Sequence, residues 1–550
     1  TRAFKDSAFT DEKQLAVEFA KHFRGKTDSL KTPSDATEIF QKLEERFKEA
    51  PQWDLSMCSS SDVAKAIDDL KPSLSFGPDS IPNKLIKALK FEALDAITLV
   101  FNKCIDEGVF PDIWKSGKIL PTFKKGAKNK IENYRPLCLF SNLGKLLEAV
   151  VKNQITPCLE RVLPSNMFGF RPGRSTQDAV CHTLDKIRRH RVDKKFVAVI
   201  ALDASAAFDT LQHDIILSSL NIIGAGDKMK TWIHSYLSDC KMFVQIGEEK
   251  SSEWISDTGS GQGRRLSPDL FNISCISQAL LCEKSDFSGY ADDGLDVVCG
   301  FTVNECNTNL QSVVRERVEW YKKIGLTLNI TKTEIVGFGY LPNKMEIEGH
   351  IIHPKEEIMF LGVKIQSDLK WTSQISTLSN KIRSAAGRIR CDGRHLTISD
   401  RRTLYMGWVQ SLVFSNGLVV LSTSSQTEID TLRTSLNAGL RAIVGLPKYG
   451  FADLAYIRSK LQIPSLESII EYTQQLAAWK KLNGITSSIE HEGMMTRSRM
   501  SKNLPHPDQR GHCSKMYEAI LTKAWNRIPI QIKNVNSLTA AKQQLKSCLL

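Results

Sequence analysis

An uninterrupted run of hydrophobic residues, Phe-Val-Ala-Val-Ile-Ala-Leu, occupies positions 196–202 and stops at Asp203. A continuous apolar run of this length is typical of a β-strand that is buried on both faces. An acidic residue at the tip of such a strand lies where a sheet can present a ligand to a metal ion or a substrate. The pattern therefore predicts a buried strand that ends on Asp203, followed by a helix that begins near His213.

Two shorter strand-like segments, 286–290 and 295–299, flank Asp292, Asp293 and Gly294, and this pattern predicts a β-hairpin. Adjacent carboxylates raise each other's pKa, so a divalent cation between them would stabilise the doubly charged pair. Asp-Gly is also a common hairpin turn without any chemistry, and the local sequence leaves both interpretations open. If the strand before Asp203 lies beside this hairpin, the three carboxylates converge at one edge of the sheet.

Hydrophobic residues three and four positions apart predict helices over much of the remaining chain. In residues 1–70 the repeat involves Phe19, Phe23, Phe40, Leu43 and Phe47, and a helix cap is expected at Ser60 or Ser61. Further helices are predicted after Asn83, after Ser141 and after a cap at Ser175, and residues 366–550 are mostly helical in pattern. A chain of 550 residues is too long for one hydrophobic core, so two to four subdomains are expected.

The charge balance narrows the class of partner. Lys and Arg number 74 against 61 Asp and Glu, which gives a net charge of +13 and favours a polyanion such as nucleic acid or an anionic membrane surface. No apolar run approaches the roughly 20 residues that a membrane-spanning helix needs. The most apolar candidate, 412–421, is interrupted by Ser415, Asn416 and Gly417. We therefore expect nucleic acid as the partner and no membrane.

The 13 cysteines are scattered and contain no C-x-x-C pair, so neither a disulfide framework nor a zinc ribbon is indicated. A reducing, intracellular compartment is expected. The first residues are polar and lack an initiator Met, which is typical of a piece of a longer chain.

Basic residues gather in the segment from Trp114 to Pro136, interleaved with short apolar pieces. A basic β-hairpin of this type can hold a triphosphate or a nucleic-acid backbone, while a solvated loop is the alternative for any single lysine. A second basic segment, 168–178, combines a Gly/Pro turn with two arginines and is followed by a helix that ends in basic residues.

These segments together resemble a known family. The chain resembles a reverse transcriptase of the non-LTR (LINE-like) retrotransposon class from about Ser75 to the C-terminus, without the endonuclease domain that usually precedes this region. The motifs that carry the resemblance are Asn133–Pro136, Phe168–Arg171, Asp203–His213, Gly259–Ile273 and Tyr290–Asp293, followed by Asn329, Lys332-Thr333, Phe360–Val363 and Trp525–Pro529.

The resemblance implies an α+β fold, the right-hand polymerase, with an antiparallel-sheet palm, α/β fingers and a helical thumb. The implied division is a helical scaffold or linker over 1–70, fingers over 71–195, a palm over 196–365, a thumb over 366–450 and a helical C-terminal region over 451–550. It also implies an RNA template, a DNA primer and deoxynucleotides as partners, and a ribonucleoprotein in the nucleus or the cytoplasm. The oligomeric state stays open.

The resemblance further implies catalysis with two Mg²⁺ ions, or Mn²⁺ in their place, since the ligands are hard oxygens. Asp203 and Asp292 would bridge the ions, Asp293 would be a third ligand, and the carbonyl of Ala204 would complete the shell. The nucleotide would be held by Arg135 and Lys124, with Phe208 as a steric gate against ribose and Gln262 near the template base. The expected contacts with primer and template are Tyr290, Gly362, Lys332 and Arg171.

The segment 259–268 departs from the family pattern at two positions. Gly261 replaces the usual Pro before the Gln, and Arg264 replaces the usual Ser that follows the next Gly. Gly loosens a turn that Pro would stiffen, and a bulky cation near the nucleotide could grip the backbone or block the pocket. A second hypothesis is therefore a catalytically impaired relic that only binds nucleic acid. A group II intron maturase is a third, disfavoured by the C-terminal Trp525–Pro529 signature.

Overall fold

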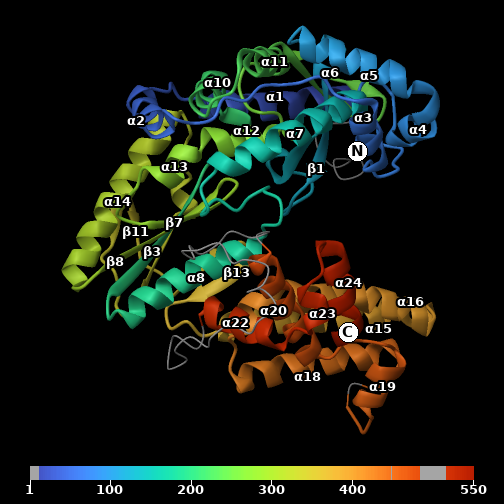
Figure 1. Cartoon of the computed structure of the whole chain (residues 1–550). Coiled ribbons are helices and arrows are strands. Elements are labelled where there is room, and N and C mark those ends of the chain that lie inside the picture. The colour runs from blue at the N-terminus through green and yellow to red at the C-terminus, as the bar shows by residue number, and fades with distance from the viewer. Residues whose placement is uncertain (1–10, 448, 484–515) are drawn as a thin grey trace. The chain divides into compact units, whose positions relative to one another are not determined.

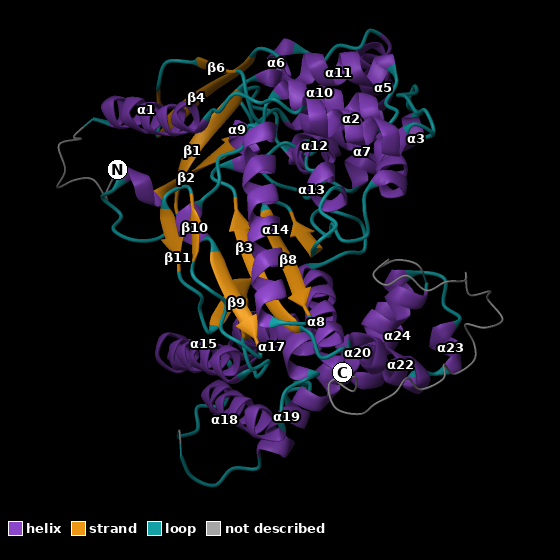
Figure 2. Cartoon of the chain, turned by 90° about the vertical axis from the view of Figure 1, so that its left-hand side faces the viewer, coloured by secondary structure: helices purple, strands orange, loops and turns teal. Residues whose placement is uncertain are grey.

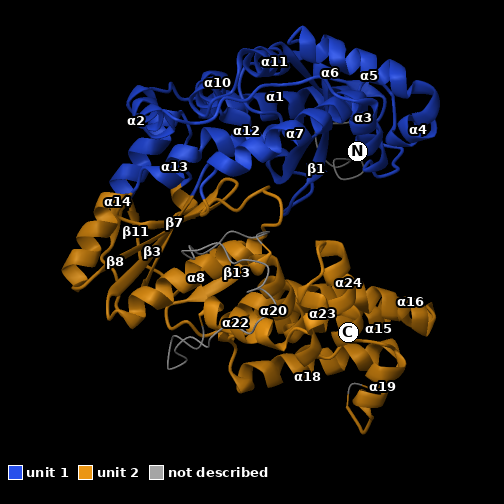
Figure 3. Cartoon of the chain, in the orientation of Figure 1, with its two compact units in different colours: residues 1–164, 203–282, 314–329 blue, residues 165–202, 283–313, 330–550 orange. Residues whose placement is uncertain are grey.

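The computed structural model describes residues 11–447, 449–483 and 516–550. These residues divide into two compact units, each assembled from three separate stretches of chain (Figure 3). Unit 1 contains residues 1–164, 203–282 and 314–329, and unit 2 contains residues 165–202, 283–313 and 330–550. One of the places where the chain passes between the units lies between Leu202 and Asp203, at the end of the predicted buried strand.

Unit 1 combines helices with one mixed sheet (Figure 1). Its helices within residues 1–164 are α1 (Glu12–Leu30), α2 (Thr37–Phe47), α3 (Ser60–Asp68), α4 (Asn83–Ala88), α5 (Lys90–Asp106), α6 (Asp112–Lys115) and α7 (Asn142–Val162). The later ones are α9 (Ala207–Thr210), α10 (His213–Ile222), α11 (Asp227–Leu237), α12 (Ser267–Ser274) and α13 (Ile276–Leu280). Helix α14 (Val303–Ile324) begins in unit 2 and ends in unit 1.

The sheet of unit 1 is built around the basic hairpin that the sequence predicted. Its strands are β1 (Gly117–Phe123), β2 (Tyr134–Leu139), β4 (Cys240–Ile246), β5 (Glu249–Lys250) and β6 (Trp254–Ser256). The order is β2-β1-β4-β5, with β6 also paired to β4, and β1 pairs antiparallel with β2 and parallel with β4. Leu15, Phe19 and Phe23 of α1 pack against Ile119 and Cys138 of the hairpin, so the first helix supports it.

Unit 2 contains residues 196–202 of the predicted strand and the hairpin that carries Asp292 and Asp293, while Asp203, the last residue of that strand, is the first residue of unit 1 after the crossing. Strands β7 (Asp286–Tyr290), β8 (Asp293–Gly300), β3 (Phe196–Asp203) and β9 (Glu334–Phe338) form one sheet in the order β7-β8-β3-β9. Residues 197–200 of β3 are fully buried, as the apolar run predicts. Figure 2 shows β8 running opposite to β3, so the end of β3 and the start of β8 lie at the same edge of the sheet.

The remaining elements of unit 2 are mostly helical. Two separate hairpins are formed by β10 (Met345–Ile347) with β11 (His350–Ile352) and by β12 (Glu357–Phe360) with β13 (Val363–Gln366). The helices are α8 (Thr176–Val192), α15 (Thr372–Cys391), α16 (Ile398–Tyr405), α17 (Ser411–Asn416), α18 (Gln426–Ile443), α19 (Leu454–Lys460), α20 (Leu466–Leu482), α22 (Tyr517–Arg527), α23 (Ile530–Lys533) and α24 (Leu538–Leu549).

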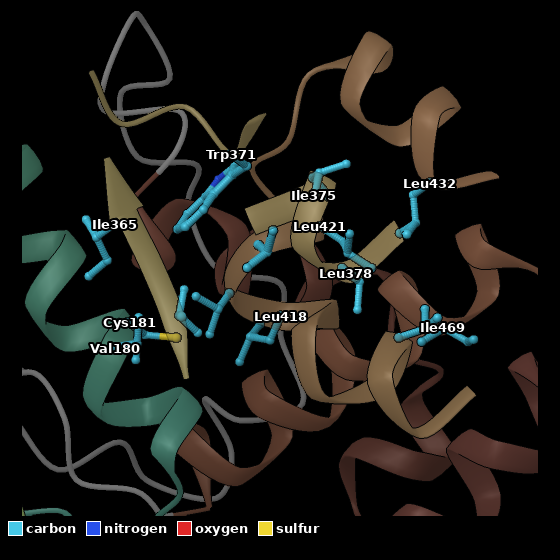
Figure 4. Packing of buried hydrophobic residues seen from close by; sticks show 14 of the residues in the cluster. Val180, Cys181, Ile365, Trp371, Ile375, Leu378, Leu418, Leu421, Leu432 and Ile469 are labelled. Atoms are coloured by element: carbon cyan, nitrogen blue, oxygen red, sulfur yellow. The ribbon is translucent and has the colours of Figure 1, made fainter. Parts of the chain in front are cut away.

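One hydrophobic core joins α8, α15–α18 and α20 to the hairpin β12-β13, and a second core packs α22, α23 and α24 against α20. Figure 4 shows Val180 and Cys181 of α8, Ile365 of β13 and Trp371 with Leu378 meeting in the first core. The buried Trp371 donates its indole hydrogen to Thr423 Oγ1 at 2.8 Å, which satisfies the ring's polar atom inside the core.

The membrane expectation needs one correction. Residues 398–421 form a single helical run of 24 residues, α16 and α17 together with the π-helical stretches Met406–Gln410 and Gly417–Leu421, which is long and apolar enough to cross a membrane. Ser415, Asn416 and Gly417 therefore do not interrupt it. Val409, Val413, Val419 and Val420 of this run are fully buried in the core of unit 2, so protein packing accounts for its apolar character.

Most helix predictions are confirmed at their starting residues. Helices begin at Asn83 and at His213, and Ser141 and Ser175 are N-caps whose side chains accept from Gly144 N and Asp178 N. The first predicted cap is wrong by one residue, because Ser59 and Asp62 form the capping box before α3. The two compact units do not test the division into fingers, palm and thumb, which stays a prediction.

Candidate functional site

The backbone that follows β3 is held by a short segment near the C-terminal end of α14. Asn329 N donates to the carbonyl oxygen of Asp203 at 2.8 Å, and Ser205 N donates to Thr327 O at the same distance. Between these bonds Ala204 forms a bridge with Leu328 and is buried. The position of the backbone at Asp203 is therefore fixed by the segment in which the sequence places the Asn329 motif.

The β7-β8 hairpin is tighter than the sequence predicted. Tyr290 pairs with Asp293 and Gly289 pairs with Gly294, so the loop consists of Ala291 and Asp292 alone. The prediction that Asp293 and Gly294 belong to the loop is wrong, and so is the alternative of a plain Asp-Gly turn. Ala291 has φ 57°, a positive value at the first loop position only, which is the pattern of a type II′ turn.

A non-glycine residue with positive φ at this loop costs free energy, and strain of this kind concentrates at functional sites. The turn presents Asp292 at its tip, partly buried, and Asp293 at the start of β8, exposed. Both predicted ligands of the hairpin therefore lie at the edge of the sheet where β3 ends.

The motif 168–171 is the support of this turn. Phe168 N donates to Gly289 O at 2.8 Å, and Gly289 N donates to Asn166 O at 2.9 Å, so the segment extends the sheet at β7. A Cβ on Gly169 would lie 2.4 Å from Ala291 N, which no side chain can tolerate. Glycine is required here because the two backbones approach closely.

Two predicted contacts with primer and template lie in the same region. The ring of Tyr290, at the end of β7, lies 6.3 Å from the ring of Phe170 and packs partly against the core of unit 2. Arg171 is buried and donates from Nη1 to Met167 O at 3.0 Å. Arg171 thus holds its own loop, and its contact with nucleic acid stays a prediction.

In unit 1, the loop that precedes α12 lies against α9, the short helix that follows the end of β3. Gly259 N donates to Leu211 O at 2.7 Å, Ser260 N donates to Phe208 O at 3.0 Å, and Thr258 Oγ1 donates to Asp209 O at 3.0 Å. The ring of Phe208 stacks on that of Phe271 with centroids 4.4 Å apart. The predicted steric gate therefore has a fixed orientation, set by α12 from one side.

Gln262 is joined to the same helix by its side chain. Its Nε2 donates to Asp209 Oδ2 at 2.7 Å, and burial raises the pKa of Asp209 to about 7. The loop also lies close to the basic hairpin, because a Cβ on Gly263 would meet Cys138 O of β2 at 2.6 Å. Phe208, Gln262 and the strand that carries Arg135 are thereby brought together within unit 1.

The basic hairpin presents its cations to solvent. Arg135 pairs with Thr122 in the β1-β2 register and is exposed, and Lys124, just past the end of β1, is exposed too. Lys124 N donates to Asn133 O at 2.8 Å, which closes the hairpin and aligns the two basic residues on one element. The structure thus places Arg135 and Lys124 on one hairpin, and their contact with a nucleotide stays a prediction.

Arg264 lies inside unit 1. Its guanidinium stacks on the rings of Phe140 and Tyr236, at 4.5 and 4.4 Å from their centroids, and its Nη1 donates to Tyr236 O at 2.7 Å. Beside it, buried Glu148 accepts from Leu266 N at 3.2 Å and from the Tyr236 hydroxyl at 3.1 Å. The expectation that Arg264 adds charge next to the nucleotide is wrong, because the side chain points into the core.

The two remaining predicted contacts lie in unit 2. Gly362 has φ 82° and, with Leu361 at φ 49°, forms the two-residue loop of the β12-β13 hairpin. It borders a small cavity that also involves Thr176, Lys381 and Asn416. Lys332 is exposed at the end of the single helical turn Ile330–Lys332. Neither position tests its predicted contact with nucleic acid.

Carboxylate oxygens are hard ligands that suit a divalent cation. Asp203 is the last residue of β3, Asp293 is the first residue of the neighbouring strand β8, and Asp292 lies in the loop before it. Over residues 11–447, 449–483 and 516–550, the structure has no group of three or more His, Cys, Asp or Glu side chains already gathered for a metal ion. Asp203, Asp292 and Asp293 therefore stay predicted ligands.

Sequence reasoning missed three residues of this region. Asp209 stood inside a recognised motif, but nothing in its spacing indicated that it would bind the Gln262 amide. The burial of Glu148 was not predicted, because the apolar pattern of its helix indicated hydrophobic packing alone. The contact of Gly169 with the hairpin turn joins residues 122 positions apart, which no local pattern reveals.

Comparison with known proteins agrees with the motifs. A family described as "Reverse transcriptase (RNA-dependent DNA polymerase)" matches residues 124–365. "RNA-directed DNA polymerase from mobile element jockey" of Drosophila melanogaster is 23% identical over 474 residues, which are 82% of this chain and 51% of that protein. "Probable RNA-directed DNA polymerase from transposon BS" of the same species is 24% identical, covering 80% of this chain and 50% of that one.

A third relative is "Retrovirus-related Pol polyprotein from type-1 retrotransposable element R1" of Bradysia coprophila, 25% identical over 70% of this chain and 40% of that protein. The chain thus spans about half the length of the first two relatives. Among solved structures, apo telomerase from Candida Tropicalis has a TM-score of 0.34 and 15% identity over 46% of this chain and 54% of that one, and this likeness carries no argument. Residues 124–365 of the chain therefore match the reverse transcriptase family, and the chain as a whole is similar to the polymerases of non-LTR retrotransposons.

Proposed function

We propose that the chain is an RNA-directed DNA polymerase that adds deoxynucleotides to a primer 3′-hydroxyl in the course of retrotransposition. The observation that carries the proposal is the strand order β7-β8-β3, in which the strand ending on Asp203 is the neighbour of the hairpin that presents Asp292 and Asp293. The match to the reverse transcriptase family over residues 124–365 supports the same reaction.

Members of the reverse transcriptase family generally use divalent metal ions. In this chain Asp203, Asp292 and Asp293 are the proposed ligands, with the backbone oxygen of Ala204 as a further donor, and two Mg²⁺ ions are the proposed metal. Bound there, the ions would lower the pKa of the attacking hydroxyl and neutralise charge on the phosphates. The protein's part is to hold the ligands, which the bonds at Asp203 and the tight turn at Ala291 do.

The proposed nucleotide site is formed within unit 1. Exposed Arg135 and Lys124 on the basic hairpin would bind the triphosphate by charge-assisted hydrogen bonds. Phe208, held by its stack on Phe271, would exclude a 2′-hydroxyl by its bulk, and Gln262 would contact the template base pair. These contacts together would select a deoxynucleoside triphosphate.

The proposed primer and template contacts are Tyr290, Gly362, Lys332 and Arg171. A net charge of +13 supports a polyanionic partner, and counterion release would make its binding strongly dependent on salt. RNA as the template and DNA as the primer are proposed from the activity named for the relatives.

The alternative of an impaired relic rests on Gly261 and Arg264. The structure gives both residues a stable place: Gly261 has φ 79°, a conformation that glycine adopts readily, and Arg264 is caged between aromatic rings away from the loop's outer surface. Neither residue supports a blocked site, so we propose an enzyme that turns over.

The experiment is extension of a DNA primer on an RNA template, with deoxynucleotides and ribonucleotides supplied in separate reactions. The proposal predicts extension with deoxynucleotides only, and predicts that Phe208→Ala admits ribonucleotides. Duplex binding without any extension would support the relic. Equal use of both sugars by the unaltered protein would contradict the role of Phe208.

A further inference from the structure

Gln262 lies between two glycines with positive φ, Gly261 at 79° and Gly263 at 96°. Because glycine has no side chain, neither neighbour can pack against the side chain of Gln262. A glutamine has several rotatable bonds, and holding them in one arrangement costs conformational entropy. If the Gln262 amide contacts the nucleotide in one orientation, a residue from another part of the fold must hold it there.

Asp209 is in position to be that anchor. The hydrogen bond from Gln262 Nε2 to Asp209 Oδ2 is 2.7 Å long, short for an amide donor. It joins the loop before α12 to α9, between residues 53 positions apart. Because the second Nε2 hydrogen and the Oε1 of Gln262 are left to other partners, the bond orients the amide without consuming its hydrogen-bonding capacity.

The backbone of Asp209 is itself fixed, which makes the anchor rigid. Asp209 N donates to Ala206 O at 2.8 Å, and Asp209 O accepts from Thr258 Oγ1 at 3.0 Å. Phe208, the adjacent residue, is locked by its stack on Phe271. One short helix thus holds both the ring proposed to read the sugar and the carboxyl that binds Gln262.

We propose that Asp209 is a positioning residue of the nucleotide site, which sets the orientation of the Gln262 amide toward the incoming nucleotide. The proposal rests on the polymerase function proposed above. Asp209 acts through Gln262 and does not itself touch the nucleotide. Its removal is therefore expected to raise the KM for deoxynucleotides more than it lowers kcat.

A double-mutant cycle between Asp209 and Gln262 tests this role. Asp209→Ala is expected to raise the KM for dTTP by about tenfold, the size of effect expected when a hydrogen bond to a carboxyl group is lost. In a Gln262→Ala background the same change is expected to raise KM by less than about twofold, because the partner is already absent. Asp209→Asn keeps an acceptor oxygen and is expected to restore most of the affinity.

The matched control is Asp227→Ala, at a carboxylate that is 96% exposed at the start of α11 and is expected to leave KM unchanged. If Asp209→Ala does not fold, Asp209→Asn and the reversed pair Asp209→Asn with Gln262→Glu replace it. The reversed pair can re-form the bond with donor and acceptor exchanged, so it is expected to bind dTTP more tightly than Gln262→Glu alone.

Additive effects of the two substitutions on KM would overturn the positioning role of Asp209. A lower melting temperature of Asp209→Ala with an unchanged KM would overturn it too. In either case, primer extension by the unaltered protein would still support the proposed polymerase function. A reversed pair no better than Gln262→Glu alone would overturn the positioning role equally. No extension by the unaltered protein would overturn the proposed function, and this inference with it.

Discussion

The position of Arg264 decides its effect on the protein. A cation beside the nucleotide would impair catalysis, but Arg264 lies in the core, where it stacks on the rings of Phe140 and Tyr236 and offsets the charge of buried Glu148. Removing one member of a buried polar cluster leaves the other uncompensated, and that is costly. Arg264 is therefore a stability residue.

Arg264→Ser is expected to lower the free energy of unfolding by about 3 kcal/mol, because it leaves a cavity between the rings and removes a cation that offsets the charge of buried Glu148. Chemical denaturation followed by tryptophan fluorescence measures this change. Arg265→Ser, at the partly exposed neighbour, serves as the control and is expected to cost less than about 1 kcal/mol. Equal losses in the two variants would show that the cage contributes nothing specific.

Gly261→Pro is expected to destabilise the protein and to lower primer extension, although proline is the family's usual residue at this place. Proline fixes φ near about −65°, whereas Gly261 has φ 79°, so the loop would have to change conformation and carry Gln262 with it. Melting temperature and KM for dTTP report the two effects. An unaltered or improved enzyme would show that the loop adopts the family's conformation after all.

The surroundings of single side chains were the hardest feature to predict from the sequence. Asp203 at the end of a buried strand could be predicted, because a run of seven apolar residues has few other interpretations. The inward direction of Arg264 could not, since it depends on aromatic residues from three distant segments.

At the scale of elements, the hairpin turn and the segment that supports it form a pair. Gly169→Ala would place a methyl group 2.4 Å from Ala291 N and push the turn away from its position. We expect a loss of extension activity of more than about tenfold and a destabilisation of about 1–3 kcal/mol, as is usual for overpacking. Steady-state extension and denaturation measure the two losses.

Gly387→Ala is the matched control for that variant. Gly387 lies inside α15, and no atom of the described residues comes within 4 Å of the place that a Cβ would take, so alanine there is expected to raise stability slightly through its helix propensity. If Gly169→Ala behaves like Gly387→Ala, the close contact at the turn is not required.

A second pair of elements, α8 and β7, is joined by ion pairs that depend on pH. His190 Nε2 lies 2.7 Å from Asp286 Oδ2, and this hydrogen bond, with a smaller contribution from Cys299, raises the pKa of His190 to about 9. Lys186 lies 2.8 Å from the other oxygen of Asp286. Burial alone would raise the pKa of Asp286, but the hydrogen bonds from His190 and Lys186 hold it well below its ordinary value.

Because the folded pKa of His190 exceeds the ordinary 6.5, its stabilisation is complete below pH 6.5 and is lost as the pH rises through about 9. The acids with raised pKa, Asp185 at about 6 and Asp209 at about 7, also lower the stability as the pH rises, but they do so mostly below that window. The melting temperature is therefore expected to fall from pH 7 to pH 9.5, and His190→Gln is expected to reduce this fall. An identical pH profile in the variant would contradict the ion pair.

The elements themselves were largely predictable. The helix start at Asn83 was predictable because Pro82 and the turn-forming residues before it force a bend, whereas the start at His213 has no side-chain cap. The extent of the β7-β8 loop was not predictable, since Asp-Gly usually forms the turn and here lies in β8 instead. Tertiary support from Gly169 overrides that local preference.

For the whole molecule, the order of the motifs predicted a reverse transcriptase, and the family of that description matches residues 124–365. The continuous helical run 398–421 could not be anticipated, because Ser415 and Gly417 read as breaks while the core of unit 2 holds the helix through them. Local propensity is a weak guide where burial is strong.

We propose that Asp203, Asp292 and Asp293 make this chain a metal-dependent polymerase. The most direct test is incorporation of labelled dTTP on an RNA template with a DNA primer, with and without Mg²⁺, by the unaltered protein and by Asp292→Asn, with Asp227→Asn as a control of equal charge change. We predict extension that requires Mg²⁺, persists in Asp227→Asn and is lost in Asp292→Asn. Extension by Asp292→Asn equal to that of the unaltered protein would contradict the account.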